Sequence, residues 1–207
     1  MDSGIHETER GVGSSDARQT LNRPVHLWLS PHDARVRELK AHGELAWGFA
    51  ETPFGGCALL LADQHVTALH FADSRQEGFD SLKSKWSSFH LRSSDSANAM
   101  IPRIFQNPES IPLLVIGTPF QLTVWEHLRS IPMGTTLTYG DVARAIGRPK
   151  AARAVGRAVG TNELSIVIPC HRVVSRGKLT GYRWGLDRKK ALLAWELSTR
   201  DPLEMPF

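Results

Sequence analysis

The stretch from Thr118 to Gly160, TPFQLTVWEHLRSIPMGTTLTYGDVARAIGRPKAARAVGRAVG, decides the fold of the C-terminal half of the chain. It opens with a threonine suited to cap a helix, a proline at the first helical position and Gln121 three residues after the cap. Apolar residues follow at spacings of four and three, which predicts a helix with one buried face made of Phe120, Val124, Leu128 and Ile131. Pro132 and Gly134 end this helix.

Two more short helices are predicted in the same stretch. Thr138 opens the first, DVARAI over 141–146, and Gly147 closes it, while Pro149 begins the second. Two short helices joined by a tight Gly-containing turn are typical of a helix-turn-helix. The second helix consists mostly of Ala and Gly, and Arg153 and Arg157 share one of its faces. It is either a tightly packed core helix with two solvated arginines or a helix pressed into a nucleic-acid groove. The basic surroundings favour the groove.

In the N-terminal half, the sequence pattern predicts β-strands. Residues 44–73, ELAWGFAETPFGGCALLLADQHVTALHFAD, contain apolar runs separated by turn signals at 53–56 and 62–64. Cys57 lies in one of these runs, where a small buried hydrophobic side chain is expected. Residues 75–112 are polar with a weak helical signal, and residues 1–22 are predicted to form a flexible tail.

Composition limits the classes of protein that the chain can belong to. At 207 residues and 41% hydrophobic it can bury a core, and it has no apolar run of about 18 residues, so no membrane span is expected. Two cysteines make no disulfide framework, which favours a reducing compartment. Residues 121–207 carry 14 Lys and Arg against 7 Asp and Glu, whereas residues 1–120 carry 11 against 14. The basic half favours a polyanionic partner, although a solubilising basic face remains the alternative.

A single cysteine stands out in IVIPCHRVV, residues 166–174. A thiol reacts as the thiolate, so Cys170 needs a base or positive charge nearby. In a plain strand, His171 would point to the opposite face, so either the chain bends at Pro169 or a water carries the proton. Glu196, beside the apolar stripe of the last helix, is predicted to be paired because an isolated buried charge is costly. It is a candidate to orient His171.

These motifs together resemble the O6-alkylguanine-DNA alkyltransferase family, also called methylated-DNA–protein-cysteine methyltransferases. The resemblance covers about residues 117–197 and rests on PCHR, on the ARAVG helix before it and on the GYRWG loop after it. It implies an α/β protein: a small N-terminal α/β domain of ribonuclease H-like type over 23–112, and a mostly helical C-terminal domain over 117–207. The second domain would carry a winged helix-turn-helix-type DNA-binding motif.

The resemblance also implies a chemistry: irreversible transfer of one alkyl group from O6 of guanine in DNA, after base flipping, to Cys170. Transfer from O4-alkylthymine stays open. His171 would deprotonate the thiol through a water, Glu196 would orient His171, and Asn162 would brace the turn that presents the thiol. An alkyl carbon on O6 lies inside the duplex, so an acceptor on a protein must extract the base first.

Five further residues would bind DNA or the flipped base. Tyr139 would press on the phosphate of the damaged nucleotide and contact the base, and Arg153 would fill the space that the base leaves. Tyr182 would line the guanine pocket together with Val173. At the position of Arg183 some family members have a serine that contacts O6, so the role of Arg183 stays open.

The expected partner is double-stranded DNA bound through its minor groove by a monomer, with cooperative binding left open. No cofactor, no metal and no membrane partner are expected, because Cys57 alone cannot supply the zinc ligands of some family members. The expected location is the cytoplasm; the protein would be associated with the nucleoid in a bacterium and would lie in the nucleus in a eukaryote. The rival interpretations are a damage sensor of the same fold, a cysteine hydrolase and a helix-turn-helix regulator.

Overall fold

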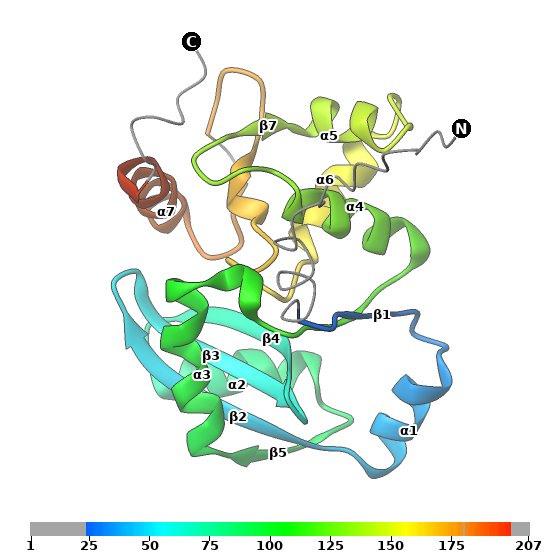
Figure 1. Ribbon diagram of the computed structural model, residues 1–207, viewed down its shortest axis with the longest axis vertical. Helices are drawn as coiled ribbons and strands as arrows, with labels where there is room; N and C mark the ends of the chain where they lie inside the picture. The colour runs from blue at the N-terminus through cyan, green and yellow to red at the C-terminus, as the bar shows by residue number, and fades with distance from the viewer. Residues whose placement is uncertain (1–23, 180, 200–207) are drawn as a thin grey trace, which may run out of the picture.

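The computed structural model describes residues 24–179 and 181–199, so the tail predicted over 1–22 lies outside the described residues. The chain forms two halves stacked along the long axis of the molecule (Figure 1). The N-terminal half, residues 24–116, contains the main sheet. The C-terminal half, residues 117–199, is mostly helical. The domain limits 23–112 and 117–207 stay a prediction.

The main sheet has the strand order β4-β3-β2-β5. Its bounds are β2 (Glu44–Thr52), β3 (Gly55–Ala62), β4 (His65–Ala72) and β5 (His90–Ser93). The first three strands are antiparallel neighbours and β5 runs parallel to β2. This confirms the strands predicted over 44–73. Gly55 and Asp63, in the two predicted turns, both have positive φ angles, 96° and 53°.

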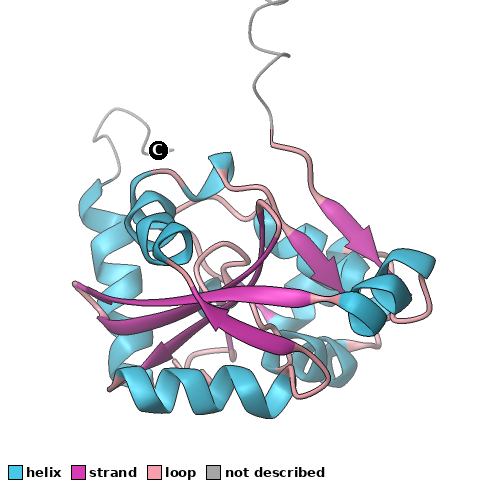
Figure 2. Cartoon of the chain, turned by 90° about the horizontal axis from the view of Figure 1, so that it is seen from below, coloured by secondary structure: helices cyan, strands magenta, loops and turns pink. Residues whose placement is uncertain are grey.

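Helices cover both faces of this sheet, and alternate residues of β3 are therefore buried on opposite sides. Cys57, Leu59 and Leu61 belong to the core that includes helix α3 (Asp95–Gln106). Ala58 and Leu60 belong to a second core, with helix α2 (Arg75–Lys85). Burial on both faces explains the unbroken apolar run of β3. Figure 2 shows the strands running between helices that lie on either side of them.

The segment 75–112 forms more regular structure than its weak helical signal suggested. Ser74 accepts a hydrogen bond from the backbone N–H of Glu77, so a Ser-x-x-Glu start was present in the sequence. A short parallel pair also closes the N-terminal half: β1 (Leu27–Leu29) pairs with β6 (Leu114–Ile116). Helix α1 (Ala34–His42) and the 3₁₀ turn η2 (Pro108–Ser110) complete it.

The C-terminal half begins with α4 (Pro119–Arg129), which has the predicted capping box between Thr118 and Gln121. Val124, Leu128 and Ile131 are buried as expected, and Phe120 is half-buried. The remaining elements are β7 (Leu137–Thr138), α5 (Tyr139–Ala145), α6 (Ala152–Gly160), the 3₁₀ turn η3 (Cys170–Arg172), β8 (Val173–Val174) and α7 (Leu186–Thr199).

Both halves share a single core cluster that runs from α3 to α7, so they are packed together rather than loosely tethered. The mixed α/β class predicted from the sequence is confirmed. Among the helices of the described residues, none is long and apolar enough to cross a membrane.

Candidate active site

The helix-turn-helix is formed by α5 and α6. Thr138 caps α5 through a second capping box with Asp141, and Gly147 ends it with a positive φ of 71°. The third predicted helix starts later than expected, at Ala152 rather than Pro149. The reason is a turn closed by the backbone N–H of Ala151, which donates to the carbonyl of Arg148. Pro149 is thus the second residue of that turn, a position that its fixed φ favours.

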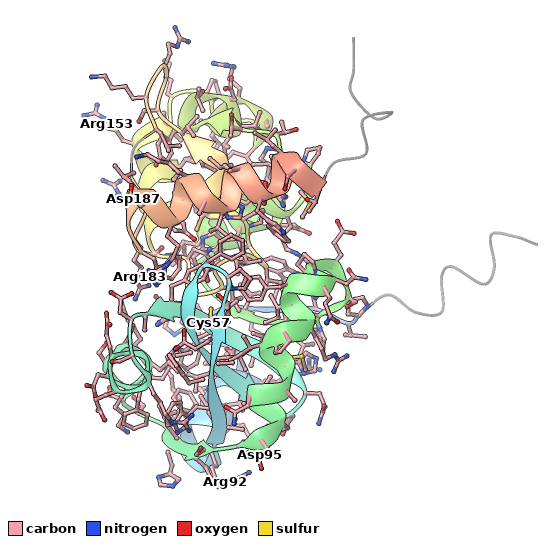
Figure 3. The ribbon with its side chains drawn as sticks, turned by 90° about the vertical axis from the view of Figure 1, so that its left-hand side faces the viewer. Cys57, Arg92, Asp95, Arg153, Arg183 and Asp187 are labelled. Carbon is pink, nitrogen blue, oxygen red and sulfur yellow. The ribbon has the colours of Figure 1, made fainter. Side chains whose placement is uncertain are left out.

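The small-residue helix α6 has one buried face and one exposed face. The buried face is that of the predicted core helix, and the exposed face carries the two arginines. Val155, Ala158 and Val159 are buried, and the carbonyl of Ala158 accepts a hydrogen bond of 2.8 Å from the indole N–H of Trp125. Arg153 and Arg157 are exposed. Figure 3 shows Arg153 projecting away from the rest of the C-terminal half. The helix is therefore a core element whose outer face is basic.

Cys170 lies at the start of η3, directly after a bend at Pro169. Asn162 holds this turn: its amide donates to the carbonyl of Ile168 at 2.8 Å, and its oxygen accepts from the N–H of Leu164 at 2.9 Å. Ile166, inside the turn, has a φ of 68°, a costly conformation for a β-branched residue. The surrounding hydrogen bonds thus impose the turn on the chain.

The Cys170 thiol is buried, with only 3% of the residue exposed. Burial raises its pKa, while a hydrogen bond with Asn162 and the positive charges of Lys189 and Arg183 act in the opposite direction. A neutral thiol in this position needs a base to become a nucleophile.

His171 and Glu196 form the base. The two side chains, each 1% exposed, meet at 2.6 Å between Nε2 and Oε1. Burial lowers the pKa of His171 more than Glu196 raises it, so the ring is neutral at neutral pH. Its other nitrogen, Nδ1, is buried and has no hydrogen-bond partner among the described residues. Because Glu196 occupies Nε2, Nδ1 is the atom available to take a proton.

Glu196 is also the centre of a network that sequence reasoning missed. The guanidinium of Arg172, 8% exposed as a residue, donates to both oxygens of Glu196 at 2.9–3.1 Å and to the carbonyl of Ile131 at 2.5 Å. The N–H of Gly134 adds a bond of 2.9 Å. Burial alone would raise the pKa of Glu196, but the bonds from His171 and Arg172 outweigh it and lower the pKa to about 2.

Lys189 is a second missed residue. It is fully buried, and its ammonium donates to the carbonyls of Val173 at 2.6 Å and Gly181 at 3.2 Å. Its sequence signal was its spacing: Lys189, Leu192 and Glu196 follow each other by three and four residues on one face of α7. The lysine therefore ties the strand that follows the thiol to the segment that precedes Tyr182.

The two predicted pocket tyrosines lie near the thiol. Burial raises the pKa values of Tyr139 and Tyr182, and in both cases the charge of Cys170 adds to the effect. The rings of Tyr182 and His171 meet edge to face, with centroids 6.4 Å apart. The hydroxyl of Tyr182 is buried without a hydrogen-bond partner in the described part of the chain, so it is available to a polar ligand. Arg183 instead pairs with Glu163 at 2.6 Å.

Within residues 24–179 and 181–199, no three His, Cys, Asp or Glu side chains are grouped as metal ligands. What the geometry offers is a thiol, a neutral imidazole aligned by a carboxylate, and tyrosines beside them. This set can attack an electrophilic carbon and remove the thiol proton.

We expect the protein to lose stability in acid, in two stages. Burial lowers the pKa of His26 to about 4 and also lowers that of His171. As the pH falls below about 6.5, these histidines therefore bind protons in the unfolded chain but not in the folded one, and the free energy of unfolding decreases. Glu196, with a pKa of about 2, adds a loss as pH falls from 4.5 towards 2, because the unfolded carboxylate protonates first. Urea unfolding at about pH 7.5, 5.5 and 4 measures the first stage and at about pH 3 the second, and His26→Gln should flatten the first stage. An unfolding free energy that is constant between pH 7.5 and 4 would contradict the assignment.

The fold and the site define a class: an α/β protein with a C-terminal helix-turn-helix and a buried cysteine beside a histidine–glutamate pair. The family model for the DNA-binding domain of 6-O-methylguanine DNA methyltransferase matches residues 119–198. The crystal structure of the Mycobacterium tuberculosis O6-methylguanine methyltransferase is 32% identical, with a TM-score of 0.63, and the match covers 76% of this chain and 96% of that one. The chain belongs to the O6-methylguanine-DNA methyltransferase family.

Two further relatives bear on the site. The Mycobacterium tuberculosis OGT solved in complex with DNA is 35% identical, with a TM-score of 0.61, over 74% of this chain and 93% of that one. The methylated-DNA–protein-cysteine methyltransferase of Salmonella typhimurium is 58% identical over 81 residues, which are 39% of this chain and 47% of the relative. The chain spans about half the length of the curated relatives it matches.

Proposed function

We propose that this protein repairs DNA by direct reversal and transfers one alkyl group from O6 of guanine to Sγ of Cys170. The observation that carries the proposal is the buried Cys170 turn beside a neutral His171 that Glu196 aligns. The names of the relatives support it, since one is a methylated-DNA–protein-cysteine methyltransferase.

The chemistry is a single displacement. The thiol sulfur attacks the alkyl carbon, a carbon–sulfur bond forms and the bond from that carbon to O6 breaks. The proton that leaves the thiol through His171 is balanced by one that the departing guanine takes up. The thioether product has no ionisable proton, and its sulfur is a poor leaving group, so the alkyl group stays on Cys170.

The experiment is label transfer. The protein is incubated with a duplex that carries O6-[methyl-labelled]methylguanine and is then digested, and the label is expected on the peptide that contains Cys170. A sensor of the same fold would bind the duplex and leave the label in DNA, and a helix-turn-helix regulator would show no preference for the lesion. A cysteine hydrolase would release the label into solution as a small alcohol.

The proposed partner is double-stranded DNA, met in its minor groove by the outer face of α6. The exposed Arg153 and Arg157 supply positive charge, and the small side chains between them let the backbone come close. The solved complex of the Mycobacterium tuberculosis OGT with DNA supports this partner. We further propose that the protein acts as a monomer and works where the DNA of its cell lies.

Arg153→Ala should slow transfer from a duplex about 10-fold or more and leave transfer from free O6-methylguanine within about twofold, because only the duplex requires base extrusion. Arg153 is one of two long exposed cations on α6, whose other side chains are small or buried. Transfer rates on the two substrates provide the measurement.

Arg157→Ala, one helical turn away, is the matched control. It should mainly weaken salt-dependent duplex binding, as the loss of one phosphate contact does. Equal losses on both substrates for Arg153→Ala would mean that this arginine supports the pocket or the fold. No loss on either substrate would remove α6 from the DNA-binding surface.

A further inference from the structure

The segment 181–185, which contains the pocket residue Tyr182, rests on the N-terminal half of the molecule. The ring of Trp184 lies 6.0 Å from that of His70 and 6.1 Å from that of Phe71, both in β4, measured between centroids. The carbonyl of Trp184 also accepts a hydrogen bond of 3.0 Å from Arg188, whose guanidinium bonds the carbonyl of Phe54 in the β2–β3 turn at 2.8 Å. The conformation of the pocket segment therefore depends on the N-terminal half.

A chain of polar side chains crosses the same boundary. His70 is fully buried, and its Nδ1 lies 2.9 Å from the hydroxyl of Ser81 on α2. Its Nε2 lies 2.7 Å from one oxygen of Glu163, whose other oxygen accepts from Arg183 at 2.6 Å. Both ring nitrogens of His70 therefore have hydrogen-bond partners. Figure 3 shows Arg183 at the level where the two halves meet.

Glu163 holds Arg183 at a particular place in the site. The residue before Glu163 is Asn162, which hydrogen-bonds the thiol, and the residue before Arg183 is Tyr182. The side chain of Arg183 is only 27% exposed. Its charge lowers the pKa of the Cys170 thiol, as does the charge of Lys189, in opposition to burial.

We propose that His70 and Glu163 are positioning residues for alkyl transfer, which hold the guanidinium of Arg183, and with it the pocket segment 181–185, against the N-terminal half. This rests on the proposed function, and it assigns a part in the reaction to the N-terminal half. The four side chains, Ser81, His70, Glu163 and Arg183, form a relay that starts in a helix on the far side of the sheet from α3 and ends at the base pocket.

The test compares variants along the relay with a control on the same boundary. Glu163→Ala should slow the maximal rate of transfer about 10-fold with both the duplex and free O6-methylguanine, since one charge-assisted tether is lost. Glu163→Gln and His70→Gln, which keep hydrogen-bonding groups in place, should recover most of the rate, while His70→Leu should not. The control is Phe54→Leu, which removes a ring contact across the same boundary, with centroids 5.5 Å from Phe54 to Trp195, without touching Arg183.

A second readout needs no DNA: the pH dependence of Cys170 alkylation by iodoacetamide. The charged and titratable groups around this thiol are Lys189 and Arg183 from its own half, Tyr139 and Tyr182 beside it, and the base made of His171 and Glu196. Removing the negative charge of Glu163 would by itself favour the thiolate and lower the pH at which alkylation is half-maximal. If Glu163 holds Arg183 in place, the midpoint should instead rise.

The proposal is overturned if Glu163→Ala and His70→Leu transfer within about twofold of the unmodified protein, or if the alkylation midpoint falls in Glu163→Ala. It is also overturned if Phe54→Leu loses as much rate as they do, since the effect would then be general destabilisation of the boundary. If the unmodified protein transfers no label, the proposed function fails, and the alkylation midpoints still decide the relay.

Discussion

Replacing Cys170 with serine is expected to abolish alkyl transfer, whereas Cys57→Ala should leave about one alkyl group transferred per protein molecule. A serine hydroxyl ionises far less readily than a thiol, and His171 is too weak a base to deprotonate it inside a buried turn. Cys57 is fully buried, and burial raises its pKa well above its usual range, so it takes no part. The measurement is a titration of labelled duplex against a fixed amount of protein.

The plateau of that titration tests the single-use character of the acceptor. The thioether of Cys170 has no proton to lose and is a poor leaving group. Label should therefore stop accumulating once the protein is consumed. Turnover that continues well beyond one group per molecule would rule out an irreversible acceptor. Unchanged transfer by Cys170→Ser would rule out this cysteine altogether.

Glu196→Gln should have two effects that arise from one network. It should slow transfer about 10²–10⁴-fold, because a neutral amide no longer aligns His171 or stabilises the imidazolium that forms. It should also lower the free energy of unfolding by about 3–5 kcal/mol, because Arg172 is left as a buried charge without its counter-ion. Urea unfolding and single-turnover transfer rates measure the two effects separately.

A double variant separates catalysis from stability. Glu196→Gln combined with Arg172→Met removes both charges of the buried pair, so much of the lost stability should return. The transfer rate should stay low, because His171 still lacks its carboxylate. If the rate recovers together with the stability, Glu196 is a structural carboxylate and the alignment of His171 matters little.

Three residues of the site could be identified from the sequence pattern itself: Cys170, His171 and Glu196. Cys170 and His171 were found because a lone thiol between proline and histidine is chemically unusual, and Glu196 because a carboxylate on an apolar stripe needs a partner. The structure brings these three together with Asn162, Tyr139 and Tyr182. Arg153 lies apart from them, on the outer face of α6.

The sequence alone determined the elements whose causes are local. The capping boxes at Thr118 and Thr138 and the positive φ of Gly147 depend on hydrogen bonds and backbone freedom within a few residues. The strands of 44–73 were readable for the same reason, since turn residues separate apolar runs.

Which charges are buried, and what they bind, depends on contacts between elements that are distant in the chain. Arg172 and Lys189 look like ordinary surface cations in the sequence, yet both are buried against residues distant in the chain. Glu163 meets His70 across 93 positions, and β1 pairs with β6 across most of the N-terminal half. Local propensity carries no information about such partners, because a buried charge is stabilised by whichever groups the packing of distant elements brings to it.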